Sequence, residues 1–335
     1  MTVDRKVLAR ARMALQEARR GYLFDPNVNL IDFGYPEHGG EIADDELAIR
    51  FHVQQKLSGV ALEMAERAGE TRAIPESIGG FATDVPEGDY RLQRWQQPVR
   101  DPRAHKNDPL CGGISISNAS QNGYGTLGGF VRDRQSGAGM ILSNYHVLCN
   151  AHAPWRVERI YQPGRLDRGT HADTIGELAR NAMGDHLDAA VARLSNGRTW
   201  INNQLGVGRV TGVGQPELGM EVVKSGRRTG ITYGRITAVE GTAKIRYGRT
   251  NRVIEYVVTV EPRHRLEEVS APGDSGSWWL DTDSRRVVAL HFAGSNSPER
   301  ALALEIQPVL DALDVELDLG ARPAWLTRSP AWHRS

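Results

Sequence analysis

From about residue 112 onward, the sequence breaks into many short runs that are rich in β-branched residues. Examples are "GTLGGFVRD", "MEVVKSG", "NRVIEYVVTV" and "RRVVALHFAG". Glycine, asparagine, aspartate and serine separate these runs, and few stretches between them have helical spacing. Many short strands divided by turn residues predict a β-sandwich or a β-barrel. We therefore expect a mainly β domain over residues 112–318, followed by a C-terminal tail over residues 319–335.

The residues before this region mix helical and extended patterns. Residues 3–20 are rich in Arg, Lys and Ala, which predicts a helix that Gly21 ends. Two extended runs, a stretch with helical spacing and a third extended run follow: "NVNLIDF", "ELAIRFHV", "GVALEMAERAG" and "IGGFATDV". These predict a small α+β domain within residues 1–95. The polar, proline-dotted segment "PEGDYRLQRWQQPVRDPRAHKNDP" indicates a linker or an ordered crossing arm, and we place the linker at residues 96–111.

Composition limits the partners and the cellular location. The chain has 335 residues, with 41 Lys and Arg against 41 Asp and Glu, so no overall field attracts nucleic acid or an anionic membrane. No run of about 18 apolar residues predicts a membrane span. Two cysteines, Cys111 and Cys149, are too few for a disulfide scaffold, and the N-terminus is charged where a signal peptide needs apolar residues. We expect a cytoplasmic protein with reduced thiols, without nucleic-acid or membrane partners.

No sequence pattern predicts a metal or a cofactor. His146 and His152 lie six residues apart, which is not a zinc spacing, and neither H-E-x-x-H nor C-x-x-C occurs. The glycine-rich "GVGRVTGVG" does not end in the Lys–Ser/Thr pair of a phosphate-binding loop. The basic segment "SGRRTG" lacks interleaved aromatic residues, so we interpret it as a solvated face. We expect no metal and no cofactor.

The segment "APGDSGSWWL", residues 271–280, places a serine in a turn built for close approach. Gly273 and Gly276 flank Ser275 and allow a sharp turn without a Cβ in the way. A serine hydroxyl is a poor nucleophile unless a base lies within hydrogen-bond reach and a third group orients that base. His146 in "ILSNYHVL" and Asp188 in "HLDAAVARL" are the candidates, each at one end of a strand-like run. Asp185, three residues before Asp188, is an alternative carboxylate.

The chain order His146, Asp188, Ser275 is that of the chymotrypsin arrangement. Here the sequence resembles the trypsin-like serine peptidases. "GDSGS" matches the serine motif except at its last position, "LSNYHV" resembles the histidine motif and "DAAVARL" the aspartate motif. "KSGRRTGITYGRI", residues 224–236, is similar to a segment of bacterial members, and the resemblance covers about residues 112–315. "ELAIRFHVQQK" and "IPESIGGF" are similar to a unit that precedes such domains in some bacterial proteins.

The resemblance implies two antiparallel six-stranded β-barrels behind the small α+β domain. It implies Ser275 as nucleophile, His146 as general base and then acid, and Asp188 as the group that holds the imidazole tautomer. The backbone N–H groups of Gly273 and Ser275 would form the oxyanion hole. Because residues 1–111 precede the barrels, Asp274 is expected to accept hydrogen bonds from local N–H groups or a nearby Arg, without an N-terminal activation step.

The implied substrate pocket has its base at Val269, with walls at Ser270, Gly294 and Ser295. No acid stands at the base position, which favours an apolar or small substrate side chain over Lys or Arg. We expect a regulated serine endopeptidase that cleaves proteins or peptides, with an N-terminal domain that binds a partner, restrains the site or builds an oligomer. One alternative is a catalytically silent trypsin-like binding module. Another is an α/β-hydrolase esterase, which needs G-x-S-x-G, whereas residue 277 is serine.

Overall fold

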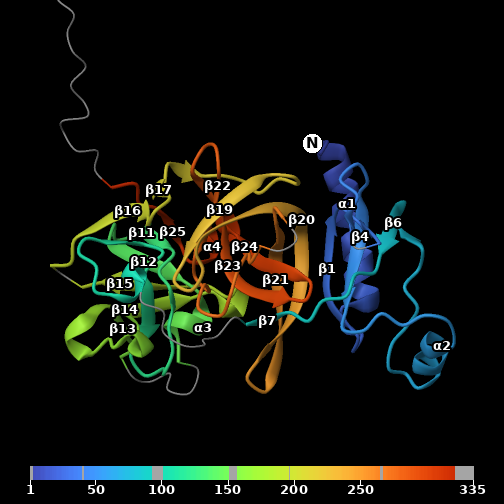
Figure 1. Ribbon diagram of the computed structural model, residues 1–335, viewed down its shortest axis with the longest axis horizontal. Helices are drawn as coiled ribbons and strands as arrows, with labels where there is room; N and C mark the ends of the chain where they lie inside the picture. Colours follow the sequence, from blue (N-terminus) through green and yellow to red (C-terminus); the bar gives the residue numbers. More distant parts are fainter. Residues whose placement is uncertain are drawn as a thin grey trace, which may run out of the picture.

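The computed structural model describes residues 3–39, 41–92, 101–150, 157–195, 197–264 and 267–320. Residues 96–100 of the predicted linker, His152 and residues 321–335 of the predicted tail lie outside this description. Most of the described elements are strands, which confirms the mainly β class (Figure 1). The helices among the described residues are all too short or too polar to span a bilayer.

One sheet has eight strands and carries the histidine and aspartate motifs. Its strands run in the order β10-β9-β13-β14-β15-β12-β11-β25, and all neighbours are antiparallel. A hydrophobic cluster that includes Phe130, Ile141 and Ile160 fills one side of it. The strands are β9 (Ser115–Asn118), β10 (Gly125–Thr126), β11 (Gly129–Asp133), β12 (Gly139–Ser143), β13 (Arg159–Tyr161), β14 (Thr174–Asn181), β15 (Ala190–Leu194) and β25 (Val315–Leu317).

Six strands of a second sheet close into a ring, and the serine motif lies just before one of them, β22. They follow the order β19-β22-β23-β24-β21-β20, and β20 pairs again with β19. Every pairing in the ring is antiparallel. The pairings thus give one closed six-stranded ring, whereas the eight-stranded sheet is an open path. The ring strands are β19 (Glu221–Gly226), β20 (Gly230–Tyr247), β21 (Thr250–Pro262), β22 (Trp278–Asp281), β23 (Arg286–Asn296) and β24 (Glu299–Glu305).

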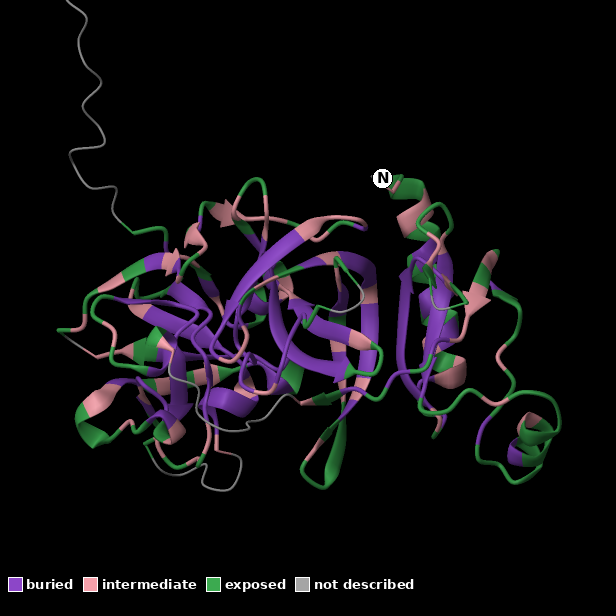
Figure 2. Ribbon diagram, in the orientation of Figure 1, coloured by how far each residue is buried: buried purple, intermediate pink, exposed green. Residues whose placement is uncertain are grey.

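The N-terminal residues extend this second sheet. Strand β1 pairs antiparallel with β20, and β4, β6 and β5 follow outward, so the predicted α+β domain is hydrogen-bonded to the ring (Figure 1). Both β1 and β4 are buried along their whole length (Figure 2). The bounds are α1 (Arg5–Tyr22), β1 (Val28–Gly34), β4 (Ala48–Val53), α2 (Gly59–Arg67), β5 (Ser77–Ile78) and β6 (Phe81–Asp84).

Helix α1 covers the outer side of this extension. Asp4 accepts a hydrogen bond from the backbone N–H of Lys6 at 2.7 Å and so caps the helix start. Ala11, Leu15 and Ala18 share one face and are buried in a hydrophobic cluster with residues of β1, β4 and the ring. A buried hydrogen bond crosses the same boundary, because Asp32, which forms an ion pair with Arg50 inside the N-terminal layer, also accepts a hydrogen bond from Thr259 of β21. The N-terminal layer and the ring therefore share one core.

The remaining elements are short. Strand β7, which follows Tyr90 in the chain, pairs antiparallel with β23. Helix α3 holds the histidine motif, and α4 packs against β23 and β25. The bounds are β2 (Glu37–His38), β3 (Glu41–Ile42), β7 (Arg91–Leu92), η1 (Pro102–Ala104), β8 (Leu110–Gly112), α3 (Tyr145–Leu148), η2 (Arg165–Asp167), η3 (His171–Asp173), η4 (Met183–Asp185), β16 (Trp200–Gln204), β17 (Gly208–Arg209), β18 (Gly212–Val213) and α4 (Ile306–Ala312).

Candidate active site

The pairing of β12 with β15 brings the histidine and aspartate motifs together. Ser143, the last residue of β12, lies opposite Ala190, the first residue of β15. His146 follows on α3, and Asp188 lies just before β15. The side-chain amide of Asn144 donates to the backbone carbonyl of Asp188 at 2.7 Å, which ties the two strand ends to each other.

Asp188 contacts His146 at two points. One carboxylate oxygen accepts the backbone N–H of His146 at 3.0 Å, and Oδ2 lies 2.5 Å from the imidazole Nδ1. Both residues are buried, with Asp188 fully so. A carboxylate at Nδ1 fixes the tautomer in which this nitrogen carries the proton. Asp185, the alternative carboxylate, is exposed on η4, so the structure brings Asp188 rather than Asp185 to the imidazole.

A tyrosine that the sequence analysis did not single out also binds this carboxylate. Tyr247 ends β20, and its hydroxyl donates to Oδ2 of Asp188 at 2.7 Å. The same oxygen therefore accepts from both Tyr247 and His146. Tyr247 reaches over from the ring that carries Ser275, whereas Asp188 and His146 belong to the eight-stranded sheet. No spacing in the sequence links a tyrosine in "RYGRT" with an aspartate 59 residues earlier.

The serine turn requires both of its glycines. Gly273 and Gly276 have φ values of +113° and +97°, which residues with a Cβ rarely adopt. A Cβ added at Gly276 would lie 2.1 Å from Oγ of Ser143, and one at Gly273 would lie 2.3 Å from the ring of Tyr124. The flanking glycines thus let the turn press against the eight-stranded sheet. Ser275 itself is 1% exposed.

Thr126 of β10 joins the serine turn to the histidine side. Its backbone N–H donates to the carbonyl of Ser275 at 2.8 Å, and its hydroxyl donates to the carbonyl of Gly273 at 2.9 Å. A Cβ added at the preceding Gly125 would lie 2.5 Å from Val147 and 3.0 Å from the Ser275 carbonyl. Gly125 therefore lies between Val147, the residue after His146, and the backbone carbonyl of Ser275.

The two catalytic candidates are not hydrogen-bonded to each other in this structure. Nε2 of His146 is buried and has no hydrogen-bond partner within the described part of the chain. The Ser275 hydroxyl donates to the backbone carbonyl of Phe292 at 3.3 Å. Rotation about χ1 of a serine moves its oxygen between staggered positions.

Asp274, next to the nucleophile, is fixed from several sides. Burial raises the pKa of its carboxyl, but Lys224 and the hydrogen bonds outweigh that effect and lower the pKa to about 2. Lys224 Nζ lies 2.8 Å from Oδ2, and both side chains are fully buried. The expected local N–H donors are present, but the cation is Lys224 rather than an arginine. The other donors are the Thr229 hydroxyl and the backbone N–H groups of Arg228, Thr229 and Ala271.

The segment "SGRRTG" is not a solvated face, which corrects the expectation from its composition. The Arg227 side chain is fully buried and binds both oxygens of Asp167, each at 2.6 Å. Its guanidinium also lies over the ring of Tyr124, 4.7 Å from the centroid. A bidentate pair of this kind satisfies a buried guanidinium, which composition alone does not reveal. The segment also contacts the serine turn directly, because the backbone N–H of Arg228 donates to the Asp274 carboxylate.

The residues predicted for the substrate pocket lie along the ring. Val269 is fully buried and belongs to the core cluster shared with the N-terminal layer, and Ser270 is buried beside it. Gly294 and Ser295 lie on β23, where Gly294 is opposite Ala301 on one side and Arg91 on the other.

A carboxylate meets the predicted base of this pocket, although none stands there in the sequence. Glu299 of β24 accepts the backbone N–H of Val269 at 2.8 Å and that of Ser270 at 3.1 Å. Burial raises the pKa of the Glu299 carboxyl. The contact joins residues about 30 positions apart in the chain, so the residue at the predicted base position does not reveal this carboxylate.

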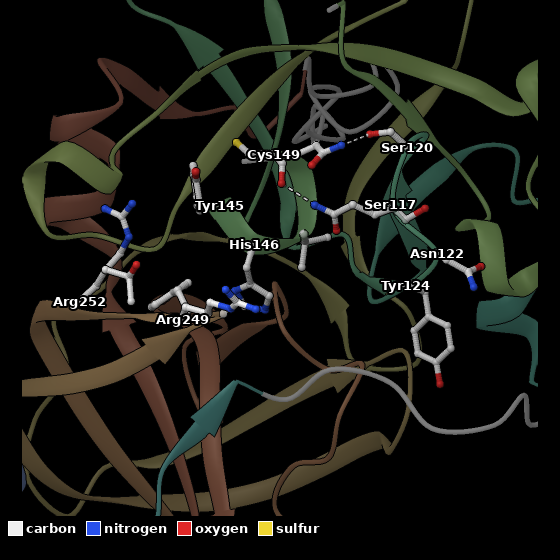
Figure 3. A pocket seen from close by; sticks show the side chains of 16 residues that line it. Ser117, Ser120, Asn122, Tyr124, Tyr145, His146, Cys149, Arg249 and Arg252 are labelled. Atoms are coloured by element: carbon white, nitrogen blue, oxygen red, sulfur yellow. Dashed lines mark hydrogen bonds between the residues drawn. The ribbon is translucent and has the colours of Figure 1, made fainter. Parts of the chain in front are cut away.

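An open pocket of about 900 Å³ lies beside the imidazole (Figure 3). His146 and Tyr145 line it from the eight-stranded sheet, and Tyr247, Arg249 and Arg252 line it from the β20–β21 hairpin. Cys149 also lines the pocket. Burial, and to a lesser degree the nearby carboxylates, raise the pKa of this thiol well above its ordinary value. Within the described residues, no cluster of His, Cys, Asp or Glu could hold a metal ion.

No protein-family model matches the chain, and no curated protein matches it in sequence. Among solved structures, the chain is similar to Thermobifida fusca Protease A, with 19% identity and a TM-score of 0.46 over 63% of this chain and 100% of that one. It is similar to Nocardiopsis Protease, with 18% identity and a TM-score of 0.47 over 63% and 98%. A glutamic acid specific serine protease gives 18% identity and a TM-score of 0.48 over 62% and 100%. These neighbours are serine proteases with the chymotrypsin fold, at low sequence identity.

Proposed function

We propose that the protein is a serine endopeptidase with a two-barrel, trypsin-like catalytic unit. The observation that supports this most directly is the buried Asp188–His146 contact, which lies beside a glycine-flanked serine turn. A carboxylate on Nδ1 leaves Nε2 as the nitrogen that can take a proton from the Ser275 hydroxyl. This is the arrangement that turns a serine into a nucleophile.

The proposed reaction has two balanced halves. Ser275 Oγ attacks the substrate carbonyl while its proton passes to Nε2 of His146, and Asp188 stabilises the imidazolium that forms. The N–H groups of Gly273 and Ser275 stabilise the oxyanion, where one such donor typically contributes about 2.7–4 kcal/mol. His146 then protonates the leaving amine, and an acyl-enzyme remains. Water, deprotonated by His146, attacks this ester and releases the acid and Ser275.

A fluorophosphonate probe tests the nucleophile directly, because it reacts with an activated serine without needing a particular peptide. We expect labelling of the wild-type chain and none of Ser275→Ala. The matched control is Ser277→Ala, which removes a buried hydroxyl two residues away in the same segment and should keep the labelling. Equal labelling of Ser275→Ala and wild type would contradict the assignment. Complete absence of labelling would instead support the catalytically silent binding module.

The esterase alternative is disfavoured by the sheets around the site. An α/β-hydrolase carries its nucleophile on a mainly parallel sheet, whereas every pairing of the ring strands with one another is antiparallel. We propose protein or peptide substrates, a cytoplasmic location and no cofactor, with narrow specificity or activation by a partner. Rapid digestion of casein by the isolated chain would contradict the proposed restraint.

We keep Val269, Ser270, Gly294 and Ser295 as the proposed pocket residues, and Glu299 becomes a fifth. Its carboxylate lies against the base where an apolar or small substrate side chain was expected. Peptide-library profiling of the wild type and Glu299→Gln decides between these preferences. A basic preference that Glu299→Gln removes would assign the carboxylate to substrate binding, and an unchanged apolar preference would assign it to holding the loop.

A further inference from the structure

On the side of strand β23 next to the proposed nucleophile, part of the strand is not paired with any other strand of the ring. On one side, β24 pairs with it from Ala289 to Asn296. On the other side, β22 pairs with it only as far as Leu290. The flank beyond Leu290 starts at the serine turn, because Gly276 donates to the carbonyl of His291 and the Ser275 hydroxyl donates to that of Phe292.

The chain's own β7 occupies this flank. Leu92 lies opposite Ala293 and Arg91 opposite Gly294, in antiparallel pairing. Leu92 packs against the core cluster of the ring, whereas the side chain of Arg91 is 80% exposed. In Figure 1, the chain leaves the N-terminal layer and reaches β7 at the lower part of the ring, where β7 pairs with β23.

Hydrogen bonds on the N-terminal side anchor the segment that leads into β7. The backbone N–H of Gly88 donates to the carbonyl of Val53 at 2.9 Å. The hydroxyl of Tyr90 lies 2.6 Å from Nδ1 of the buried His52. Arg300 of β24 donates to the carbonyl of Glu87 at 2.9 Å, so the anchor reaches the ring as well. Strand β7 is therefore held as a tethered strand at a fixed register.

An extended peptide binds a sheet by adding a strand to an open edge, and one edge accepts one strand. A peptide whose scissile bond faces Ser275 would have to run along the nearest free edge, which is β23 at Ala293–Gly294. We propose that Arg91–Leu92 of β7 fills, in the resting protein, the edge along which such a peptide would run, so that cleavage requires β7 to leave. This inference rests on the proposed peptidase function.

The tether makes β7 a strong competitor although only two of its residues are paired. A segment joined by a short stretch of chain acts at an effective concentration of the order of millimolar. The apparent affinity for a free peptide then falls in proportion to the small open fraction. A small electrophile that reaches Ser275 without pairing to β23 escapes this competition. Peptide cleavage and small-probe labelling should therefore respond differently to changes in β7.

The first test replaces both paired residues by proline in the full chain. In an antiparallel ladder one opposite pair exchanges hydrogen bonds and the next does not, so Arg91→Pro/Leu92→Pro removes the donor in either register. We expect kcat/KM for an unstructured peptide to rise about tenfold or more, with fluorophosphonate labelling unchanged. Arg91→Ala, which removes only the exposed side chain, should behave like the wild type. Unchanged peptide cleavage in the labelled double variant would overturn the proposal.

The second test locks β7 in place and does not depend on the proline variant folding. Opposite residues in an antiparallel pair have Cα atoms about 4.5–5.5 Å apart, within the range that a disulfide spans. Oxidised Leu92→Cys/Ala293→Cys should lose peptide cleavage about tenfold or more and regain it on reduction. Oxidised Leu92→Cys alone is the control. A bond verified by mass spectrometry that leaves cleavage intact would disprove occlusion by β7.

The two proposals fail in different ways. If no variant, open or locked, is labelled at Ser275 or cleaves peptide, the peptidase function itself is wrong. If labelling and peptide cleavage are present but neither the proline pair nor the disulfide changes the ratio between them, only the occlusion by β7 is wrong.

Discussion

Two buried aspartates flank the proposed reaction centre, and their partners differ. Asp188 is shared by the backbone and Nδ1 of His146 and by the Tyr247 hydroxyl. Asp274 faces the Lys224 ammonium, the Thr229 hydroxyl and backbone N–H groups. Both carboxylates are fully buried. One is thus joined to an imidazole, and the other to the ammonium of a buried lysine.

The difference in partners indicates that Asp188 serves the proposed reaction, whereas Asp274 serves the structure of the turn. Around Asp188, the proposed reaction requires a charge to appear on His146, and the carboxylate binds the imidazole that would carry it. Around Asp274, a buried ion pair holds the turn whose N–H groups are proposed to form the oxyanion hole. Changes on the histidine side should therefore alter rate more than stability, and changes on the serine side should alter stability first.

The largest effect is expected from Asp188→Asn. The amide can offer an N–H where the carboxylate accepted one, which favours the tautomer with the proton on Nε2 and removes the base. We expect kcat to fall about 10⁴-fold, as the loss of this role costs in a serine triad. The measurement is kcat with a saturating peptide, beside an unfolding curve that should change little. Asp185→Asn, at the exposed neighbour, is the control, and a fall of less than about tenfold for Asp188→Asn would refute the role.

Lys224→Met should act mainly on stability. Removing one partner of a buried ion pair leaves the other charge uncompensated, which typically costs about 3–5 kcal/mol in the free energy of unfolding. Lys224→Met/Asp274→Asn should recover most of this loss, because neither charge is then buried alone. Urea unfolding measures both, and Lys106→Met, from an exposed pair with Asp173, is the control at about 1 kcal/mol or less. A double variant as unstable as Lys224→Met would contradict this account of the pair.

The Lys224–Asp274 pair also makes the free energy of unfolding depend on pH in the acid range. Because the pKa of the Asp274 carboxyl is lowered from 3.8 to about 2, its contribution to stability is complete above pH 4 and is lost as the pH falls toward 2. The wild type should therefore lose its advantage over Lys224→Met/Asp274→Asn within this window. A difference in unfolding free energy that stays constant from pH 5 to about 2 would show that Asp274 does not titrate there.

The sequence predicted the local chemistry of the site better than its long-range support. Gly273 and Gly276 reveal a strained turn because only glycine tolerates their φ values. The run before His146 and the run after Asp188 predict strands, and β12 and β15 are neighbours in the sheet. These features depend on a few adjacent residues. Local pattern is enough to find them.

The supporting residues depend on contacts between distant parts of the chain. Lys224 and Arg227 have the composition of a surface segment, yet both are fully buried against aspartates from other loops. Strand β1 is buried along its whole length because Ile31 and Phe33 pack in the cluster that includes α1, while Leu30 packs in the core cluster of the ring. This burial removes the alternation that would reveal a half-exposed strand. The two paired residues of β7 are too few to predict a strand. Their partner becomes visible only in the fold.

Tyr247→Phe tests the shared oxygen of Asp188 at an intermediate size of effect. Tyr247 is a positioning residue, and a hydrogen bond to a charged group contributes about 1.5–3 kcal/mol, so kcat/KM should fall about ten- to hundredfold. With one donor fewer, the carboxylate stabilises the imidazolium more strongly, so the acidic limb of the pH profile of kcat/KM should move to higher pH. Tyr233→Phe, at an exposed position of the same strand, is the control. A lower rate without a displaced limb would indicate a structural role only.

The smallest effect is expected at Cys149, which lies on the histidine side three residues after His146 and lines the open pocket. Burial raises the pKa of this thiol, so it stays protonated at neutral pH and is a poor nucleophile. Cys149→Ala should change kcat/KM by no more than about twofold, as expected for a small buried apolar side chain. Iodoacetamide treatment of the wild type should leave peptide cleavage intact, while Ser275→Ala abolishes it. If the reagent inactivated the wild type and Cys149→Ala prevented this inactivation, the nucleophile would be Cys149 on the histidine side rather than Ser275.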